Sequence, residues 1–102
     1  MEVGDWLLVI ITYDVNTTTS EGRRRLRQVS KKCLDYGQRV QNSVFECIVD
    51  STQFRKLKYE LVALIDPKTD SLRFYQLGDN YKRKVDHVGA KESFDVEGPL
   101  IL

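Results

Sequence analysis

The sequence predicts a single α+β domain with one small sheet and two helices, on three observations. A chain of 102 residues has the usual size of one domain and buries roughly two-thirds of its unfolded surface. Short apolar runs with strand character alternate along it with two stretches of helical period. Glycine, proline and capping side chains separate these runs, as expected at the ends of helices and strands.

The first strand is expected in residues 6–15, WLLVIITYDV, because seven of its first eight residues are apolar or aromatic. The run shows no clean alternation, which is typical of a central strand covered on both faces. Thr18 and Glu21 have capping-box spacing and predict the start of a helix, which ends at Gly37. The apolar stripe of this helix is formed by Leu26, Val29, Cys33 and Tyr36.

Residues 38–50, QRVQNSVFECIVD, number thirteen, which is long for one strand. We interpret them as a bulged or hairpin-like pair of strands interrupted near Asn42. A second helix is expected to begin at Asp50 or Ser51 and to end before Pro67, because a residue that precedes proline avoids the α region. The buried stripe of this helix is predicted to hold Phe54, Leu57, Leu61, Leu64 and Ile65.

Two further strands are expected at residues 71–77, SLRFYQL, and at residues 84–88, KVDHV. With residues 38–50 split in two, the first six elements match the β-α-β-β-α-β order of a ferredoxin-like sandwich. The apolar tail at residues 92–102 is expected to form an extra edge strand that pairs with a partner chain. The prediction is therefore one ferredoxin-like domain over residues 1–102, with residues 92–102 as a partner-pairing tail.

The composition is that of an ordinary globular protein, with 41% hydrophobic and 30% charged residues and a net charge of +1. So small a net charge gives no overall attraction to nucleic acid or to a membrane surface. The charges are unevenly placed, because residues 21–41 hold seven bases and two acids, whereas residues 92–102 hold three acids and no base. One region is therefore basic and the C-terminal tail is acidic.

Cysteine usage and the N-terminal run indicate a protein of the cytoplasm. Cys33 and Cys47 lack CxxC spacing, which predicts free thiols in a reducing compartment. The apolar run at residues 6–15 is too short to span a bilayer, and it follows two acids instead of the basic segment of a secretory signal. We therefore expect a cytoplasmic protein without a membrane anchor.

Asp14 is the first candidate for chemistry, because a carboxylate at the end of a rigid central strand suits a metal ligand or a general base. In the alternative, Asp14 only organises the polar loop through an Asx-turn. One carboxylate alone makes a poor Mg²⁺ site, and the chain has no nearby DxD or HExxH motif. A two-fold axis near Asp14 would bring two copies together, and a cation between them would offset their repulsion.

The run RRRLRQVSKK is the second candidate, because it places several bases on one face of the expected helix. Such a face suits contacts with a phosphate backbone. A solvated outer face of an amphipathic helix is the alternative. Arg39 either extends the basic region or pairs with Asp35. The bases on or flanking the helix face are Arg23, Arg24, Arg27, Lys31 and Lys32.

Other chemical motifs are weak in this sequence. His87 is the only histidine, and no Cys or Asp spacing supports a ligand role for it. The sequence has no Ser-His-Asp order, no glycine-rich phosphate loop and no RNP1 pattern of an RNA recognition motif. Tyr59, Phe74 and Tyr75 are expected in the core or an interface, not in a base-stacking platform.

Two blocks of the chain resemble the Cas-two family of CRISPR-associated proteins. The first is an apolar strand ending in Tyr13-Asp14, and the second is a basic helix followed by GQRVQNSVFE at residues 37–46. The second block is the specific one, and the resemblance covers nearly the whole chain. The ending GAKESFDVEGPLIL is similar to the variant found with type I-C systems. Asn16 departs from the family pattern, since many relatives have a second acid there.

The resemblance implies a ferredoxin-like homodimer in which the C-terminal strands are exchanged between protomers. It implies a role in acquiring new CRISPR spacers, in complex with the Cas-one integrase dimer. It also implies a metal-dependent endonuclease acting on double-stranded DNA or single-stranded RNA, with Asp14 as catalytic Mg²⁺ ligand. Mn²⁺ suits the same oxygen ligands. The residues that would then hold the nucleic acid are Arg23, Arg24, Arg27, Lys31 and Arg39, with Lys82, Arg83 and Lys84 as further candidates.

Two other functions stay open on the sequence. In one, the protein is a non-catalytic adaptor that bridges integrase dimers and clamps DNA, so that Asp14→Ala has no effect. In the other, it is a toxin-like ribonuclease, for which selective RNA cleavage and growth arrest would be diagnostic. The nuclease and adaptor roles are compatible, whereas a small-molecule sensor has no feature of the sequence in its favour.

Overall fold

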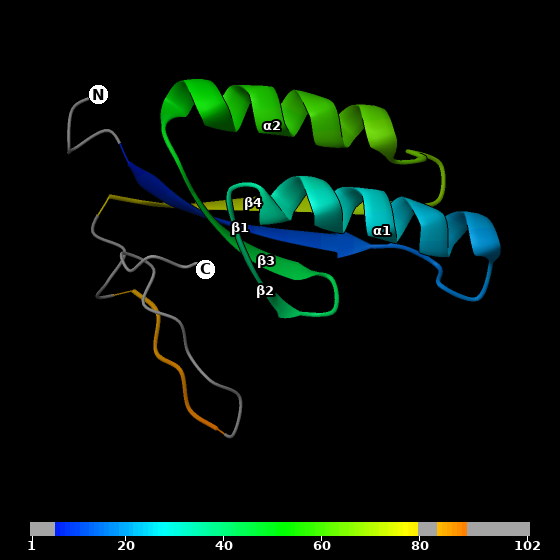
Figure 1. Ribbon diagram of the computed structural model, residues 1–102, viewed down its shortest axis with the longest axis horizontal. Coiled ribbons are helices and arrows are strands. Elements are labelled where there is room, and N and C mark those ends of the chain that lie inside the picture. Colours follow the sequence, from blue (N-terminus) through cyan, green and yellow to red (C-terminus); the bar gives the residue numbers. More distant parts are fainter. Residues whose placement is uncertain (1–5, 80–83, 90–102) are drawn as a thin grey trace.

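The computed structural model describes residues 6–79 and 84–89, which form one sheet with two helices packed on it (Figure 1). The order of elements is strand, helix, strand, strand, helix, strand. The prediction of an α+β, ferredoxin-like βαββαβ sandwich is confirmed. The elements are β1 (Leu7–Asp14), α1 (Ser20–Leu34), β2 (Gly37–Gln41), β3 (Val44–Val49), α2 (Ser51–Leu64) and β4 (Ser71–Gly78).

β1 is a central strand, as its apolar sequence predicts, and the sheet has the order β2-β3-β1-β4. Each neighbouring pair in this sheet is antiparallel. β1 and β2 therefore run in the same direction with β3 between them, and α1 crosses from one to the other. α2 connects β3 to β4 in the same way, so that both helices cover the same face of the sheet (Figure 1).

The long segment at residues 38–50 forms the predicted hairpin, with β2 and β3 as its arms. The pairing shifts register between Arg39 and Gln41, so the predicted bulge is present as well. Gly37 starts this hairpin where the backbone of β3 lies very close. A Cβ atom at position 37 would lie 1.8 Å from the carbonyl oxygen of Glu46, so only glycine fits there.

α1 begins one residue later than the predicted capping box. Its N-cap is Thr19, whose hydroxyl oxygen accepts a hydrogen bond from the Gly22 N–H at 3.0 Å. The prediction of a cap at Thr18 is wrong, because Thr18 donates both its N–H and its hydroxyl to the side-chain oxygen of Asn16. At α2 the prediction is confirmed, because Asp50 and Gln53 form a complete capping box.

The core lies between the sheet and the helices. Along β1, Val9, Ile11 and Tyr13 face the helices and are buried. The residues that alternate with them are half-buried or exposed, apart from the buried Leu8. The two cysteines are free thiols within this core. The buried cluster is formed by Val9, Ile11, Tyr13, Leu26, Val29, Cys33, Phe45, Cys47, Val49, Leu57 and Leu61.

The face of the sheet away from α1 and α2 differs from the expectation that β1 is covered on both sides. Ile10 and Thr12 on this face are only half-buried, and no helix in the described ranges lies over them. The lack of clean alternation in β1 arises because Ile10 is apolar although it points away from the helices. β1 therefore carries apolar side chains on the face that α1 and α2 do not cover.

The strand predicted at residues 84–88 is wrong. Among the described residues they pair with no strand, and all of them are exposed, with Val88 at 94% of its full surface. Val85 is 37% exposed, so neither valine of this segment packs into the core. The tail at residues 92–102 lies outside the described residues. Within the described ranges, no helix has the length and apolar character needed to cross a membrane.

Candidate functional site

Asp14 is the last residue of β1, and its side chain is exposed. Successive residues of a strand point to opposite faces, so Asp14 lies on the face away from the helices whereas Tyr13 points toward them. The backbone of Asp14 is paired with Ser71 at the start of β4. The carboxylate therefore stands at the tip of a rigid central strand, where a substrate can reach it.

The described residues of one chain supply only part of a metal site. No group of three or more His, Cys, Asp or Glu side chains lies together among them. Asn16 cannot supplement Asp14, because its side-chain oxygen already accepts two hydrogen bonds from Thr18. Mg²⁺ usually keeps several waters and binds through one or two carboxylates and substrate phosphate. Asp14 fits such a site as one ligand among water, phosphate and a second carboxylate.

Arg73 shares the face of the sheet on which Asp14 lies, and sequence reasoning missed it. It is directly opposite Thr12 on the neighbouring strand, two residues before Asp14. Its side chain is exposed, and its Nη1 donates to the Tyr75 hydroxyl at 3.0 Å. The alternation in SLRFYQL predicts this placement, because Leu72 and Phe74 on either side of Arg73 pack against the core.

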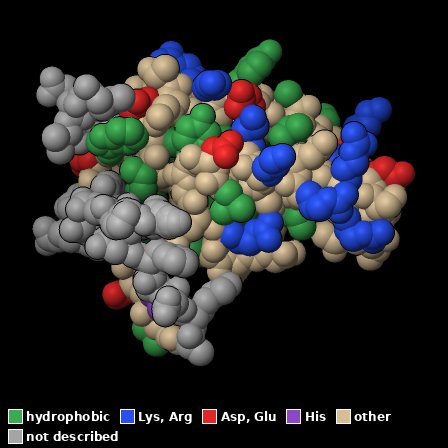
Figure 2. All heavy atoms as spheres, viewed as in Figure 1, with side chains coloured by type: hydrophobic (Ala, Val, Ile, Leu, Met, Phe, Trp, Pro, Cys, Tyr) green, Lys and Arg blue, Asp and Glu red, His purple; other side chains and the backbone are tan. Residues whose placement is uncertain are grey.

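The basic residues singled out on α1 are all exposed, apart from the half-buried Lys32. Figure 2 shows Lys and Arg side chains gathered at the end of the molecule where α1 begins in Figure 1. Arg23 also donates from Nη1 to the carbonyl oxygen of Thr17 at 3.0 Å, which fixes the preceding loop. Lys32 is set apart, because it lies 3.6 Å from Glu60 on α2. The exposed bases of this surface, the α1 basic face, are Arg23, Arg24, Arg27 and Lys31.

Arg39 lies on the edge strand β2 and is also exposed. Its guanidinium carbon is 5.6 Å from the centre of the Phe45 ring, and it lies opposite that residue. Phe45 belongs to the core, so Arg39 is on the same side of the sheet as α1. The described part of the chain shows no ion pair between Arg39 and Asp35. The structure thus places Arg39 on the helix side of the sheet, whereas Asp14 lies on the other side.

The remaining residues singled out in the sequence lie outside this arrangement. Lys84 donates to the carbonyl oxygen of Leu77 at 2.6 Å, whereas Lys82 and Arg83 lie outside the described residues. His87 is exposed. Tyr59 is not a core residue, because 78% of its surface is exposed on α2.

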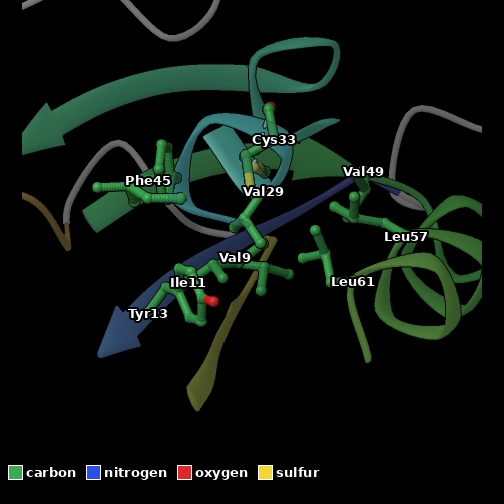
Figure 3. Close-up of a cluster of buried hydrophobic side chains, with 11 residues drawn as sticks. Val9, Ile11, Tyr13, Val29, Cys33, Phe45, Val49, Leu57 and Leu61 are labelled. Carbon is green, nitrogen blue, oxygen red and sulfur yellow. Dashed lines mark hydrogen bonds between the residues drawn. The ribbon is translucent and has the colours of Figure 1, made fainter. Parts of the chain in front are cut away.

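A buried polar cluster joins β1, α1 and the turn before β4, and sequence reasoning missed it. The Asp70 side chain has no exposed surface. It accepts hydrogen bonds from the Tyr13 hydroxyl at 2.5 Å and from Arg25 Nε and Nη2 at 2.8 and 3.2 Å. The Asp66 N–H at 3.0 Å and the Thr69 hydroxyl at 3.1 Å complete the set. Figure 3 shows Tyr13 among the core side chains of β1.

At neutral pH, Asp70 in this cluster is ionised and Tyr13 is neutral. Burial alone would raise the pKa of Asp70, but hydrogen bonds from Arg25, Tyr13, the Asp66 backbone and Thr69 outweigh it and lower the pKa to about 2. Burial, and then the hydrogen bond to Asp70, raise the pKa of Tyr13 to about 12. Arg25 is therefore a half-buried counter-ion and not a member of the α1 basic face. In the sequence, Arg25 directly precedes Leu26 of the apolar stripe, and this position indicates that its side chain lies at the edge of the buried face of α1.

Comparisons with known proteins agree with this geometry. The sequence model of the family described as CRISPR associated protein Cas2 matches residues 7–85. A CRISPR-associated endonuclease Cas2 of Halalkalibacterium halodurans is 65% identical over 96 residues, which are 94% of this chain and 100% of the relative. A CRISPR-associated endoribonuclease Cas2 of Nitratidesulfovibrio vulgaris is 57% identical over 98 residues, with 96% of each chain covered. The crystal structure of Streptococcus pyogenes Cas2 at pH 6.5 is 58% identical, with a TM-score of 0.74 over 80% of this chain and 99% of that one.

Proposed function

The chain belongs to the Cas2 family of CRISPR-associated proteins, and on that premise we propose that it is a metal-dependent endonuclease of CRISPR adaptation. It cleaves phosphodiester bonds of double-stranded DNA or single-stranded RNA. The observation that carries the proposal is the exposed carboxylate of Asp14 at the tip of β1, on the face of the sheet away from the helices. The names of the relatives, endonuclease and endoribonuclease, support the same class of reaction.

Asp14 is the proposed protein ligand of Mg²⁺, for which Mn²⁺ can substitute. When bound, the cation supplies an activated water and offsets the charge of the phosphate. Asp14 holds and orients the ligand set from a backbone that β3 and β4 fix on both sides. Arg73, on the same face of the sheet, supplies a positive charge for the phosphate next to the one that is cleaved.

A second copy of the chain completes the proposed site. The face that carries Asp14 also carries apolar side chains, and Tyr75 there is 43% exposed. A two-fold axis on this face would bury them and bring two copies of Asp14 together. A cation between the two carboxylates would offset their mutual repulsion. The tail at residues 92–102 is proposed to pair with the partner chain. The half-buried apolar residues of this face are Ile10, Val44 and Ile48.

The α1 basic face and Arg39 are proposed to hold the nucleic acid by its phosphates, irrespective of base sequence. The same surface favours a second function, that of an adaptor that holds DNA for the Cas-one integrase dimer. The observation in favour of this role is that four exposed cations lie on α1. The adaptor role needs the cations but not Asp14, so the two roles are separable by substitution.

The test is cleavage of labelled duplex DNA and single-stranded RNA by purified protein, with Mg²⁺ or with a chelator. Asp14→Asn is the test variant, and Asp35→Asn, which alters another exposed acid, is its matched control. We expect wild type and Asp35→Asn to cut only with Mg²⁺ and Asp14→Asn to lose cleavage by about a hundredfold or more. Equal cleavage by all three proteins would place the activity elsewhere. No cleavage by any of them would favour the adaptor, and binding to the integrase would then be measured.

A further inference from the structure

The cluster of Tyr13, Arg25 and Asp70 is used by no step of the proposed reaction, yet it adjoins both halves of the proposed site. Tyr13 comes from the end of β1, Arg25 from the first half of α1, and Asp70 from the turn before β4. One carboxylate thus connects the strand that carries Asp14 with the helix that carries the basic face. These are the two parts whose relative placement decides which phosphate the metal reaches.

On the strand side, the cluster determines where Asp14 points. Tyr13 and Asp14 are neighbours in an extended strand, so their side chains project to opposite faces. The Tyr13 hydroxyl is fixed to Asp70 at 2.5 Å, and its N–H donates to the Ser43 carbonyl at 2.9 Å. Asp14 is paired with Ser71, the residue that follows Asp70. A twist or fraying of this strand end would have to break the Tyr13 contact first.

On the helix side, Arg25 sets the position and rotation of α1. Its Nε and Nη2 contact both oxygens of Asp70, and this forked contact restricts orientation as well as distance. Arg24, the preceding residue, and Arg27, two residues later, belong to the exposed basic face. A helix held through Arg25 therefore presents that face at one fixed angle to the tip of β1.

The chemistry of the cluster favours a role in geometry over a role in stability alone. Apolar side chains of similar volume would often stabilise the core as well as a buried ion pair does. A polar network in which every group is satisfied supplies, in addition, one defined arrangement. Asp70 meets this condition, because it accepts hydrogen bonds from two side chains of other elements and from its own turn.

We propose that Tyr13, Arg25 and Asp70 are positioning residues that fix Asp14 relative to the α1 basic face. This inference rests on the proposed nuclease function. If the cluster is loosened, Asp14 and the α1 basic face are both still present, but their relative position is no longer fixed. Cation binding at Asp14 weakens and cleavage spreads over neighbouring phosphates, while nucleic acid still binds to α1 when no metal is present.

The test uses Tyr13→Phe, which removes one hydroxyl and keeps the buried ring. Three quantities are measured: the Mn²⁺ affinity from the EPR signal of the unbound ion, the set of cleavage positions on an end-labelled duplex, and the dissociation constant of that duplex in chelator. We expect the Mn²⁺ affinity to fall by up to about tenfold, the factor that the loss of one hydrogen bond allows. Cleavage positions should spread, and the dissociation constant should stay unchanged.

The control is Val49→Ala, which removes buried methyl groups opposite Leu7, at the other end of β1. If Val49→Ala changes Mn²⁺ affinity and cleavage positions as much as Tyr13→Phe does, the cluster only stabilises the fold and the inference is wrong. Asp70→Asn should reproduce the effect of Tyr13→Phe. Wild-type Mn²⁺ affinity and cleavage positions in both variants would also overturn the inference. Wild-type cleavage by Asp14→Asn is a different result, because it would refute the proposed nuclease function itself.

Discussion

Asp70 shows how one buried residue makes the fold sensitive to pH. Its carboxylate is ionised in the folded protein because Arg25, Tyr13 and Thr69 and the Asp66 backbone donate to it. In the unfolded chain these donors are replaced by water, and the pKa returns to its ordinary value of 3.8. The folded state therefore binds the proton of Asp70 less readily than the unfolded state does.

This difference predicts a loss of stability in acid. A folded pKa of about 2 against an ordinary value of 3.8 means that Asp70 stabilises the fold above pH 3.8 and that this contribution disappears as the pH falls toward 2. The shift corresponds to about 2 kcal/mol in the free energy of unfolding. Urea unfolding followed between roughly pH 5 and pH 2 should show a steeper decline for wild type than for Asp70→Asn. Parallel declines would contradict the assignment.

α1 places its charged side chains in two different environments. Arg25 and Lys32 are turned toward the rest of the molecule, where Asp70 and Glu60 neutralise them. The bases of the α1 basic face have no ion pair among the described residues and stay exposed to solvent. Sequence alone makes these arginines and lysines look equivalent, whereas only the exposed ones are free to bind phosphate.

Because only some bases of α1 are exposed, we can predict which substitutions change the salt dependence of nucleic-acid binding. Removing one cation that binds a phosphate should reduce the slope of log affinity against log salt by about 0.9 on duplex DNA. The double variant Arg24→Gln with Arg27→Gln should lower the slope by about 2, measured by fluorescence anisotropy in chelator. Lys32→Gln is the matched control and should leave the slope unchanged. A reduction of about 0.9 in the control would assign the effect to net charge and not to this face.

The elements show what could be predicted from sequence and why the rest could not. Asp50 was predictable as a cap because Gln53 completes its box locally, and the hairpin was predictable from the length of residues 38–50. The prediction of Thr18 as the cap of α1 was wrong because the Thr18 hydroxyl donates to Asn16 instead. Residue spacing does not show this competing hydrogen bond. The position of Asp14 at a strand end followed from the apolar run. The cluster around Asp70 did not, since its donors lie up to 57 residues away in the chain.

At the scale of the whole molecule, the sheet is covered by the helices on one face only, within the residues described (Figure 1). The other face combines half-buried apolar residues with the carboxylate of Asp14. An apolar surface of this kind is usually covered by a partner. The proposal that two copies share the site therefore joins two observations, the uncovered apolar residues and the incomplete ligand set.

This arrangement predicts that assembly and metal binding fail together. Ile48→Glu places a charge on the proposed interface, and an unpaired buried charge should raise the dissociation constant of the dimer by about a hundredfold or more. Val62→Glu on the exposed side of α2 is the matched control. Analytical ultracentrifugation should find monomers only for Ile48→Glu, and that variant should also lose Mn²⁺ binding. A monomer that still binds Mn²⁺ tightly would show that one chain suffices.

The alternation in β1 also determines how this strand tolerates changes in length. Tyr13 and Asp14 have opposite surroundings, although they are adjacent. Inserting or deleting one residue just before them would reverse both side chains, placing the carboxylate against the helices and the phenol in solvent. A change of two residues would restore the directions but displace the tip from Ser71. An insertion or deletion of one residue in this part of β1 is therefore expected to be more disruptive than a substitution.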